Sequence, residues 1–438
     1  MRQASWRWVS AAVLALVLGG TVAACGSDDD SSTSTSSTQA AAATTGASTG
    51  ASTQAAADCT GDPVKIVSVS NTSSPLSSQT PEFGPSAAAA AKAATDECTL
   101  GAPVEVIDCD DKFTPNGAAA CARKAVSEKA AAAVTYSGFG DSILPILQAA
   151  KIPSLNNATS SSENSSPDSF PTAYPITTLF GELSLAAGAG AKSVVIVTYD
   201  IPSVKFFTQL AAAQAATLGM KVMPAITFAP TETDMASYAG QVIDSKADAY
   251  IPIVGAPQEL GLAKALRQQG ADLSKSPLYI SGLNNQTPAF VKQLGDSDGL
   301  LSVAWAWSPS ATDNPAIAQY LKEMEAAGAS TDPSSLTIQG VTAWASVHVA
   351  VDTMKAVGEN TGPGLAEGLN GGKAPDTTKY GLAPIDFTKP AFPQGPLAKL
   401  RLFSSSSSAW KFDASGVPQP LGDGWFSVLK PFDMGAAG

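Results

Sequence analysis

The stretch KSVVIVTYDIPSVKFFTQLAAAQAATLGMKVMPAITF, residues 192–228, decides the fold class. It begins with a run of β-branched and apolar residues at 192–200, which is typical of a buried strand. A segment of helical composition follows at 203–219, and a second strand-like run at 221–228 ends the stretch. A strand, a helix and a strand in this order predict two parallel strands joined by a crossover helix.

The same alternation continues in both directions. Before this stretch we expect strands at 64–70, 103–110, 131–137 and 152–159, with helices at 85–97, 114–130 and 141–151. After it we expect strands at 248–255, 277–282 and 300–308, with helices at 235–247, 257–270 and 287–295. Two such series predict an α/β fold with two doubly wound parallel-sheet lobes, because the body, about residues 60 to 438, is too long for one ordinary core.

The pattern changes after the second series. Two helices are expected at 314–328 and 338–358 with no strand between them. The tail, residues 380–438, is rich in Pro, Ser and Gly, and contains short strand-like pieces such as AKLRLFS and WFSVL. We expect this part to pack against the lobes and close them, without forming a third domain.

The N-terminal residues are typical of an export signal. Arg2 and Arg7 precede an apolar run at 9–18, and small residues then lead to Cys25. Val-Ala-Ala directly before this cysteine resembles the lipobox of bacterial lipoproteins, which implies cleavage after residue 24 and acylation of the Cys25 thiol. An ordinary signal peptide with an incidental cysteine is the alternative. Residues 25–58 are Ser-, Thr- and Ala-rich without an aromatic residue, so we expect a disordered tether.

The charge of the chain limits its partners. Removal of residues 1–24 takes away Arg2 and Arg7, which leaves 24 basic against 38 acidic residues and changes the formal charge from −12 to −14. An acidic chain of this kind argues against nucleic acid and against anionic lipid as partners.

Four cysteines remain in the body, at positions 59, 98, 109 and 121. An even set in an exported chain predicts two disulfides, for which three connectivities exist. We favour Cys109–Cys121, which joins a strand end to the following helix, and Cys59–Cys98, which ties the start of the body to the end of its first helix. A metal site is the alternative, but the chain has no C-x-x-C spacing and a single histidine, so we expect no metal and no cofactor.

Several stretches, in this order and spacing, resemble the type I solute-binding proteins of ABC transporters, in the leucine/isoleucine/valine- and amide-binding branch. The resemblance covers about residues 62 to 430. It depends on VKIVSVSNTSSP with EFGPSAAAAAKAA, on VEVIDCDDKFTPNGAAACARKAV, on AAAVTYSGFGDSILPILQAAKIPSLNNAT, and on the helix pair TDNPAIAQYLKEMEAAG and TIQGVTAWASVHVAVDTMKAVG.

This resemblance implies the domain organisation and the role. Lobe one would comprise residues 59–178 and 309–384, and lobe two residues 179–308 and 385–438. Three crossovers near 176–180, 304–310 and 383–388 would form a hinge that closes the inter-lobe cleft on a ligand. The implied protein is a monomer on the outer face of the cytoplasmic membrane. Its partners would be a small-molecule ligand, an ABC permease and the lipid anchor on Cys25.

The resemblance also implies cleft residues in lobe one. They are Phe83, Ser137, Gly138, Phe139, Asn157, Ala158 and Thr159. The turn at 137–141 leads from a strand into a helix, so its backbone N–H groups could bind a carboxylate or carbonyl oxygen. Asn157 and Thr159 can donate and accept hydrogen bonds, and the two phenylalanines could cover an apolar ligand or belong to the core.

Lobe two would contribute residues from three loops. They are Tyr199, Asp200, Ala256, Gly282, Leu283, Asn284 and Asn285. Amino-acid binders of the family usually have a carboxylate in the last of these loops, which holds the ammonium of the ligand, and ISGLNNQ at 280–286 has none. Asp200 could replace it, or could be a solvated loop acid or a helix cap. The expected ligand is a branched-chain amino acid, an amide or a related apolar or aromatic acid.

Two other functions deserve comparison. An enzyme is not indicated, because the chain has no H-E-x-x-H and no P-loop, and its G-x-S-x-G match at 46–50 lies in the tether. The pair Asp110 and Asp111 fits a structural loop, and His348 fits a packed position in an apolar helix. A ligand-sensing surface receptor of the same fold, not coupled to a permease, stays open as the alternative function.

Overall fold

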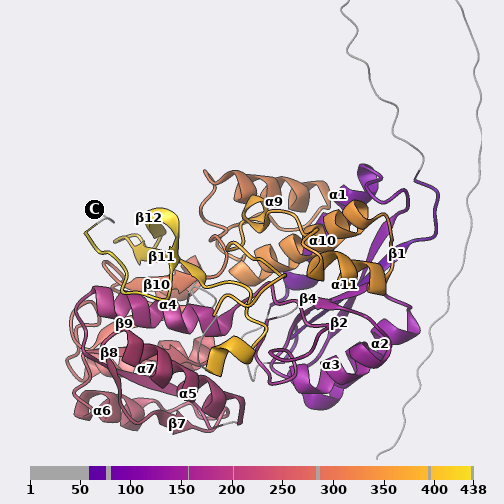
Figure 1. Ribbon diagram of the computed structural model, residues 1–438. Coiled ribbons are helices and arrows are strands. Elements are labelled where there is room, and N and C mark those ends of the chain that lie inside the picture. Colours follow the sequence, from indigo (N-terminus) through magenta and orange to yellow (C-terminus); the bar gives the residue numbers. More distant parts are fainter. Residues whose placement is uncertain are drawn as a thin grey trace, which may run out of the picture. The chain divides into compact units, whose positions relative to one another are not determined.

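A computed structural model describes residues 59–74, 80–155, 157–200, 202–282, 287–392 and 396–435. The expected signal peptide, Cys25 and the tether lie outside the described residues. Figure 1 shows the arrangement of the helices and strands. None of the helices in the described part is long and apolar enough to cross a membrane.

The first sheet has four parallel strands in the order β2-β1-β3-β4. They are β1 (Val64–Ser70), β2 (Val104–Asp110), β3 (Ala132–Tyr136) and β4 (Ser154–Leu155). Alternate residues of β1 belong to different cores, since Ile66 packs in one cluster while Val67 and Val69 pack in the other. Both faces of this sheet are therefore covered, as the apolar strand runs predicted.

Helices cover the two faces of the first sheet. They are α1 (Phe83–Asp96), α2 (Pro115–Ser127), α3 (Gly140–Ala149), α9 (Pro315–Ala326), α10 (Ile338–Val357) and α11 (Gly362–Asn370). Helices α2 and α3 pack together, and α1 packs against α9 and α10 (Figure 1). The two helices expected after the second series thus return to the first sheet.

The second sheet has eight strands in the order β12-β11-β10-β9-β8-β5-β6, with β7 also paired to β5. The strands are β5 (Ser193–Tyr199), β6 (Lys221–Val222), β7 (Ile226–Phe228), β8 (Ala249–Ile253), β9 (Leu278–Gly282), β10 (Leu301–Ala304), β11 (Ser406–Phe412) and β12 (Pro418–Ser427). The helices are α4 (Pro175–Gly188), α5 (Pro202–Thr217), α6 (Ala236–Asp244), α7 (Ala256–Gln268) and α8 (Pro288–Leu294). All pairs among β5 to β10 are parallel.

The tail contributes more regular structure than the sequence predicted. Strands β11 and β12 extend the second sheet as an antiparallel hairpin, because β10 leaves an edge on which β11 pairs. Trp410 and Phe412 of β11 are buried while Lys411 between them is exposed, because successive side chains of a strand point to opposite faces of the sheet. The piece AKLRLFS is not a strand; a short 3-10 helix (Pro396–Lys399) begins just before it.

Other elements also differ from expectation. The run 221–228 is two short strands, since Pro224 has no N–H for the ladder. The strand expected at 152–159 is limited to Ser154–Leu155, and Ala158 beyond it has a left-handed backbone with φ 46°. Helix α4 was not predicted at all, and neither was α11, whose sequence GPGLAEGLN contains three glycines and a proline.

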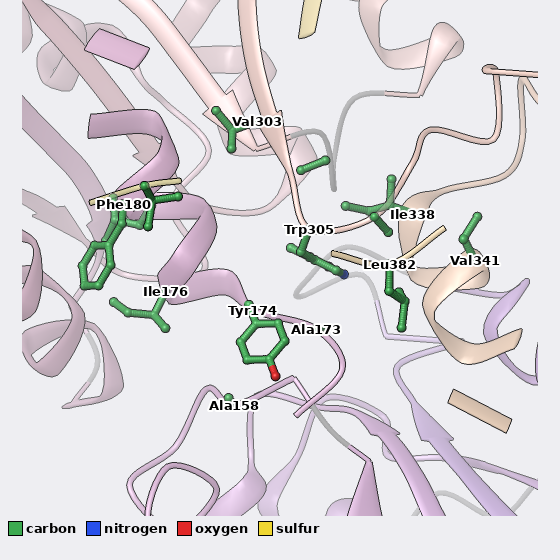
Figure 2. Packing of buried hydrophobic residues seen from close by; sticks show 14 of the residues in the cluster. Ala158, Ala173, Tyr174, Ile176, Phe180, Val303, Trp305, Ile338, Val341 and Leu382 are labelled. Carbon is green, nitrogen blue, oxygen red and sulfur yellow. The ribbon is translucent and has the colours of Figure 1, made fainter. Parts of the chain in front are cut away.

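Two of the three crossover segments hydrogen-bond to each other. The N–H of Trp307 donates to the carbonyl of Gly381 (2.8 Å), and the N–H of Ala383 donates to the carbonyl of Trp305 (3.0 Å). Figure 2 shows Trp305 with Leu382 and with Ile338 of α10 in this region. The segments near 304–310 and 383–388 therefore lie side by side, while the boundaries of the lobes stay a prediction.

Both favoured disulfides are present. Cys59 pairs with Cys98 and Cys109 pairs with Cys121, with Cα atoms 5.4 and 5.7 Å apart. The second joins the end of β2 to α2, and so fixes the loop at Asp110 and Asp111 between them. The hydroxyl of Thr114 caps α2 by accepting the N–H of Gly117 (3.0 Å).

Candidate ligand-binding site

A cavity lies where strands of both sheets end. Its lining includes Tyr136 at the end of β3, residues 252–254 at the end of β8, Ser281 and Gly282 at the end of β9, and Trp305 just after β10. Its volume, counted with its opening to solvent, is about 550 Å³. The carboxyl ends of parallel strands are where open α/β sheets bind ligands.

Two helices of the second sheet complete the lining. Helix α4 contributes Pro175, Thr178, Leu179 and Glu182, and α5 contributes Phe207. Helix α4 is close to β10 because Gly181 has no side chain: a Cβ atom there would lie 2.6 Å from Cγ1 of Val303. Gly181 thus allows α4 to pack close to β10, and the neighbouring Glu182 lines the cavity.

Aromatic rings form the wall on the side of the first sheet. Tyr136 stacks on Trp305 with ring centroids 6.3 Å apart and planes 29° apart. Helix α10 fixes both rings, since Nε1 of Trp305 donates to Oγ1 of Thr342 (2.9 Å) and Nε2 of Gln339 donates to the Tyr136 oxygen (3.3 Å). Burial raises the pKa of Tyr136 to about 12, so its hydroxyl is neutral at physiological pH.

The polar face of α4 has two groups that the protein does not satisfy. Thr178 and Glu182 are four residues apart, so they lie on the same helix face. The Thr178 hydroxyl is buried and has no hydrogen-bond partner among the described residues. Glu182 is only 4% exposed, and its carboxyl group has no hydrogen bond or ion pair in the described part of the chain.

A second buried carboxyl group lies close behind the lining. Glu259 of α7 is 1% exposed and accepts hydrogen bonds from the Tyr279 hydroxyl and from the Ser281 hydroxyl (2.5 Å). Burial, together with the charge of Glu259, raises the pKa of Glu182 well above its usual range. The lining itself includes no lysine, arginine or histidine among the described residues.

The structure places the predicted lobe-one residues beside this cavity, not in its lining. Asn157 and Thr159 donate side-chain hydrogen bonds to the carbonyl of Ser137 (3.2 and 3.0 Å), and the Ser137 hydroxyl donates to Asp111 (2.5 Å). These three predicted residues are thus brought together, in a buried hydrogen-bonded cluster. Gly138 and Phe139 lie next to Phe113.

Ala158 and Phe83 are both buried, and Phe83 contacts Tyr136 with ring centroids 6.2 Å apart.

At the turn 137–141, the carboxyl group of Glu163 lies against Gly140, where a Cβ atom would be 2.4 Å from Oε2. That carboxyl group accepts the N–H groups of Thr159 and Ser160 (both 2.9 Å), and burial raises its pKa to about 6. A carboxyl group of the chain itself thus lies at the start of α3, and ligand binding by this turn stays a prediction.

The predicted lobe-two residues are spread over three loops. The Tyr199 hydroxyl accepts the N–H of Gly255 (2.7 Å) and donates to Gln258 (3.2 Å), which fixes the loop before α7. Asp200 is exposed and Ala256 is half-buried. Gly282 is the one predicted residue of the described part that lines the cavity, and Leu283, Asn284 and Asn285 lie outside the described residues.

The sequence analysis missed Glu182, Thr178, Tyr136 and Trp305 as lining residues. For Glu182 a signal existed: it is the one charged residue in PITTLFGELSLAAG, a segment that is otherwise apolar or small and polar.

The residues considered for catalysis are structural. Asp111 accepts the N–H of Phe113 (2.7 Å), and His348 pairs with Glu323 (2.8 Å) and stacks on Tyr380.

The comparisons with known proteins agree with this architecture. A search of curated proteins finds no significant match. Among solved structures, a solute-binding protein of an ABC transporter from R. palustris in complex with 4-hydroxybenzoate has a TM-score of 0.66 at 19% identity, over 85% of this chain and 99% of that one. A branched-chain amino acid ABC transporter protein from Thermus thermophilus with bound valine has a TM-score of 0.69 at 14% identity, over 84% and 97%.

A fatty acid ABC transporter substrate-binding protein from Thermomonospora curvata has a TM-score of 0.67 at 17% identity, over 84% of this chain and 94% of that chain. These likenesses establish the two-lobed α/β fold with parallel sheets. The sequence model described as periplasmic binding protein matches residues 63–396, which is most of the chain. The chain therefore belongs to the periplasmic binding protein family, whose members bind solutes and are not enzymes.

Proposed function

We propose that this protein is the substrate-binding lipoprotein of an ABC importer and captures a small solute by hinge closure. The observation that supports this most directly is the cavity at the strand ends of both sheets, since a ligand there contacts both lobes at once. The segments near 304–310 and 383–388 hydrogen-bond to each other beside it, and hinges consist of a few loop or element-terminal residues.

The ligand class follows from the cavity and from the relatives. A lining of aromatic and aliphatic side chains with a few polar groups suits a small, partly apolar solute. Related solved structures hold valine or 4-hydroxybenzoate, which are both small solutes. We infer a branched-chain amino acid, an amide or a related apolar or aromatic acid as the solute.

The remaining parts of the proposal concern location and organisation. Lobe one is assigned to residues 59–178 and 309–384, and lobe two to 179–308 and 385–438. The protein is expected on the outer face of the cytoplasmic membrane, held by lipid on Cys25, as a monomer that delivers its solute to a permease. The predicted cleft residues outside the cavity lining are expected to approach the ligand when the lobes close.

Thermal unfolding of the full chain with a solute panel tests this function. A ligand at about 100 times its dissociation constant adds about 2.7 kcal/mol to the stability of the native state, so a bound solute raises the melting temperature. Thr178→Phe, which fills the cavity from α4, should abolish the shift, while circular dichroism confirms that this variant folds. A shift that survives in Thr178→Phe would place the solute elsewhere, and loss of solute uptake on deletion of the gene tests the transport role.

A further inference from the structure

We propose that Glu182 binds a positively charged nitrogen of the solute, so that this cavity selects organic cations or zwitterions with an ammonium group and rejects anions. This inference rests on the proposed function, because it assumes that the solute occupies the cavity lined by α4. It assigns to one residue of α4 the carboxylate that the loop at 280–286 does not provide.

The first step is the state of the Glu182 carboxyl group. It lines the cavity, is 4% exposed, and has neither a hydrogen bond nor an ion pair within the described part of the chain. Buried carboxylates are costly unless they are paired, so proteins rarely retain one without a partner. The Thr178 hydroxyl, one turn earlier on the same face, is also without a partner among the described residues. Both residues belong to the lining of the cavity that a ligand would fill.

The second step is the sign of the charge around the cavity. The field that acts on Glu182 is that of Glu259, a like charge on α7. A cationic ligand would neutralise part of this negative field, whereas an anionic ligand would add to it in a medium of low dielectric constant. Because the described lining supplies no cationic side chain, the ligand is the source of the missing positive charge.

The third step is the wall opposite α4. Tyr136 and Trp305 are stacked rings fixed by α10, and Phe207 adds a third aromatic side chain. Aromatic faces attract ammonium groups within about 6 Å of the ring centroid. Leu179 and Val254 provide apolar contacts for the rest of the ligand. A carboxyl group, aromatic rings and aliphatic side chains together fit an amine with an alkyl or aryl body.

The fourth step links binding to pH. Strands β8 to β11 and helix α5 pack against α4. The titratable groups on their described parts are Tyr250, Tyr279 and the exposed Lys411, and Glu259 of α7 acts on Glu182 as well. Because the pKa of Glu182 is raised, its carboxyl group stays protonated in the free protein at pH values where an ordinary carboxyl group is ionised. A bound cation must therefore displace that proton. Affinity for a cation should therefore rise with pH, up to about tenfold per unit, while affinity for an anion should fall.

The experiment is calorimetric titration of the full chain with two matched series. One series is isoamylamine, isovaleramide and isovalerate, and the other is benzylamine, benzamide and benzoate, with leucine as the zwitterion. We expect binding of amines or leucine, tighter at about pH 8 than at about pH 6, and no binding of the acids. Glu182→Gln should weaken amine binding at least about tenfold and remove its pH dependence. Glu325→Gln, on the exposed face of α9, is the matched control and should change neither.

The outcomes separate the inference from the proposed function. Preferred binding of an acid or amide, or amine binding that Glu182→Gln leaves unchanged, overturns the role of Glu182 and leaves solute capture intact. Binding of none of these compounds contradicts both. Glutamine has nearly the shape of glutamate, so Glu182→Gln changes the charge of the side chain and not its size. The melting temperature of the variant reports whether it folds.

Discussion

At the scale of single residues, the buried carboxyl group of Glu182 makes the stability of the unliganded protein depend on pH. Its pKa is raised in the folded state, so the folded state binds this proton more tightly than the unfolded state does. This tighter proton binding contributes to the free energy of unfolding at pH values below the pKa that Glu182 has in the unfolded chain. As the pH rises above that pKa, the contribution falls by about 1.4 kcal/mol per pH unit, until the pH reaches the pKa that Glu182 has in the folded protein.

Glu182→Gln should therefore stabilise the free protein near pH 7, and change its stability by almost nothing near pH 4. Urea unfolding of both proteins over this pH range measures the difference in free energy. Glu325→Gln, at an exposed position, should follow the wild type throughout. Equal stability of the Glu182 variant and the wild type at all pH values would mean that the carboxyl group is solvated or paired.

Trp305 is a second residue with a measurable role, because it lines the cavity and is 1% exposed. Ligand binding or lobe closure should change its surroundings and hence its emission. Trp305→Phe should remove most of the ligand-induced fluorescence change. Trp425→Phe, on β12 and outside the cavity lining, is the control and should retain that change; the reverse pattern would move the ligand away from Trp305.

At the scale of elements, the strands were the most predictable part. The run VKIVSVS was expected at 64–70 and is β1 with the same bounds, because β-branched residues without breakers leave few alternatives. Helix α4 was not predicted, although it provides four lining residues. The place of Glu182 in the lining depends on the packing of α4, which is close to β10 because Gly181 leaves room for Val303. Such a contact between distant residues has no local sequence signal.

The disulfide between β2 and α2 gives a prediction at this scale. Cys109 and Cys121 are 12 residues apart, and the chain-entropy model gives a stabilisation of about 3 kcal/mol for a loop of this length. The double variant Cys109→Ser, Cys121→Ser should be less stable by about that amount in urea unfolding. With a reductant present, the wild type should lose this advantage over the variant. A difference that persists after reduction would point to a packing role of the cysteine side chains, since Cys121 is buried.

At the scale of the whole molecule, the charge of the chain agrees with the proposed ligand class. The sequence has a formal net charge of −12, and Glu259 is buried close behind a cavity lining that has no cationic residue among its described members. A negative field of this kind attracts cationic solutes and accelerates their association, and salt weakens that effect. The association rate of an amine should thus fall with ionic strength, whereas that of a neutral amide should not.

The lipid anchor gives the last prediction, which concerns where the whole molecule is found. If Cys25 bears a diacylglycerol, two acyl chains contribute about 0.8 kcal/mol per buried CH₂, enough for stable attachment without a membrane-spanning helix. Cys25→Ser should therefore move the protein from the membrane fraction to the soluble fraction, with its solute binding unchanged. Mass spectrometry of the wild-type N-terminal peptide should find the lipid on Cys25 and no residue before it. A wild-type protein that is already soluble, with an unmodified thiol at Cys25, would support an ordinary signal peptide instead.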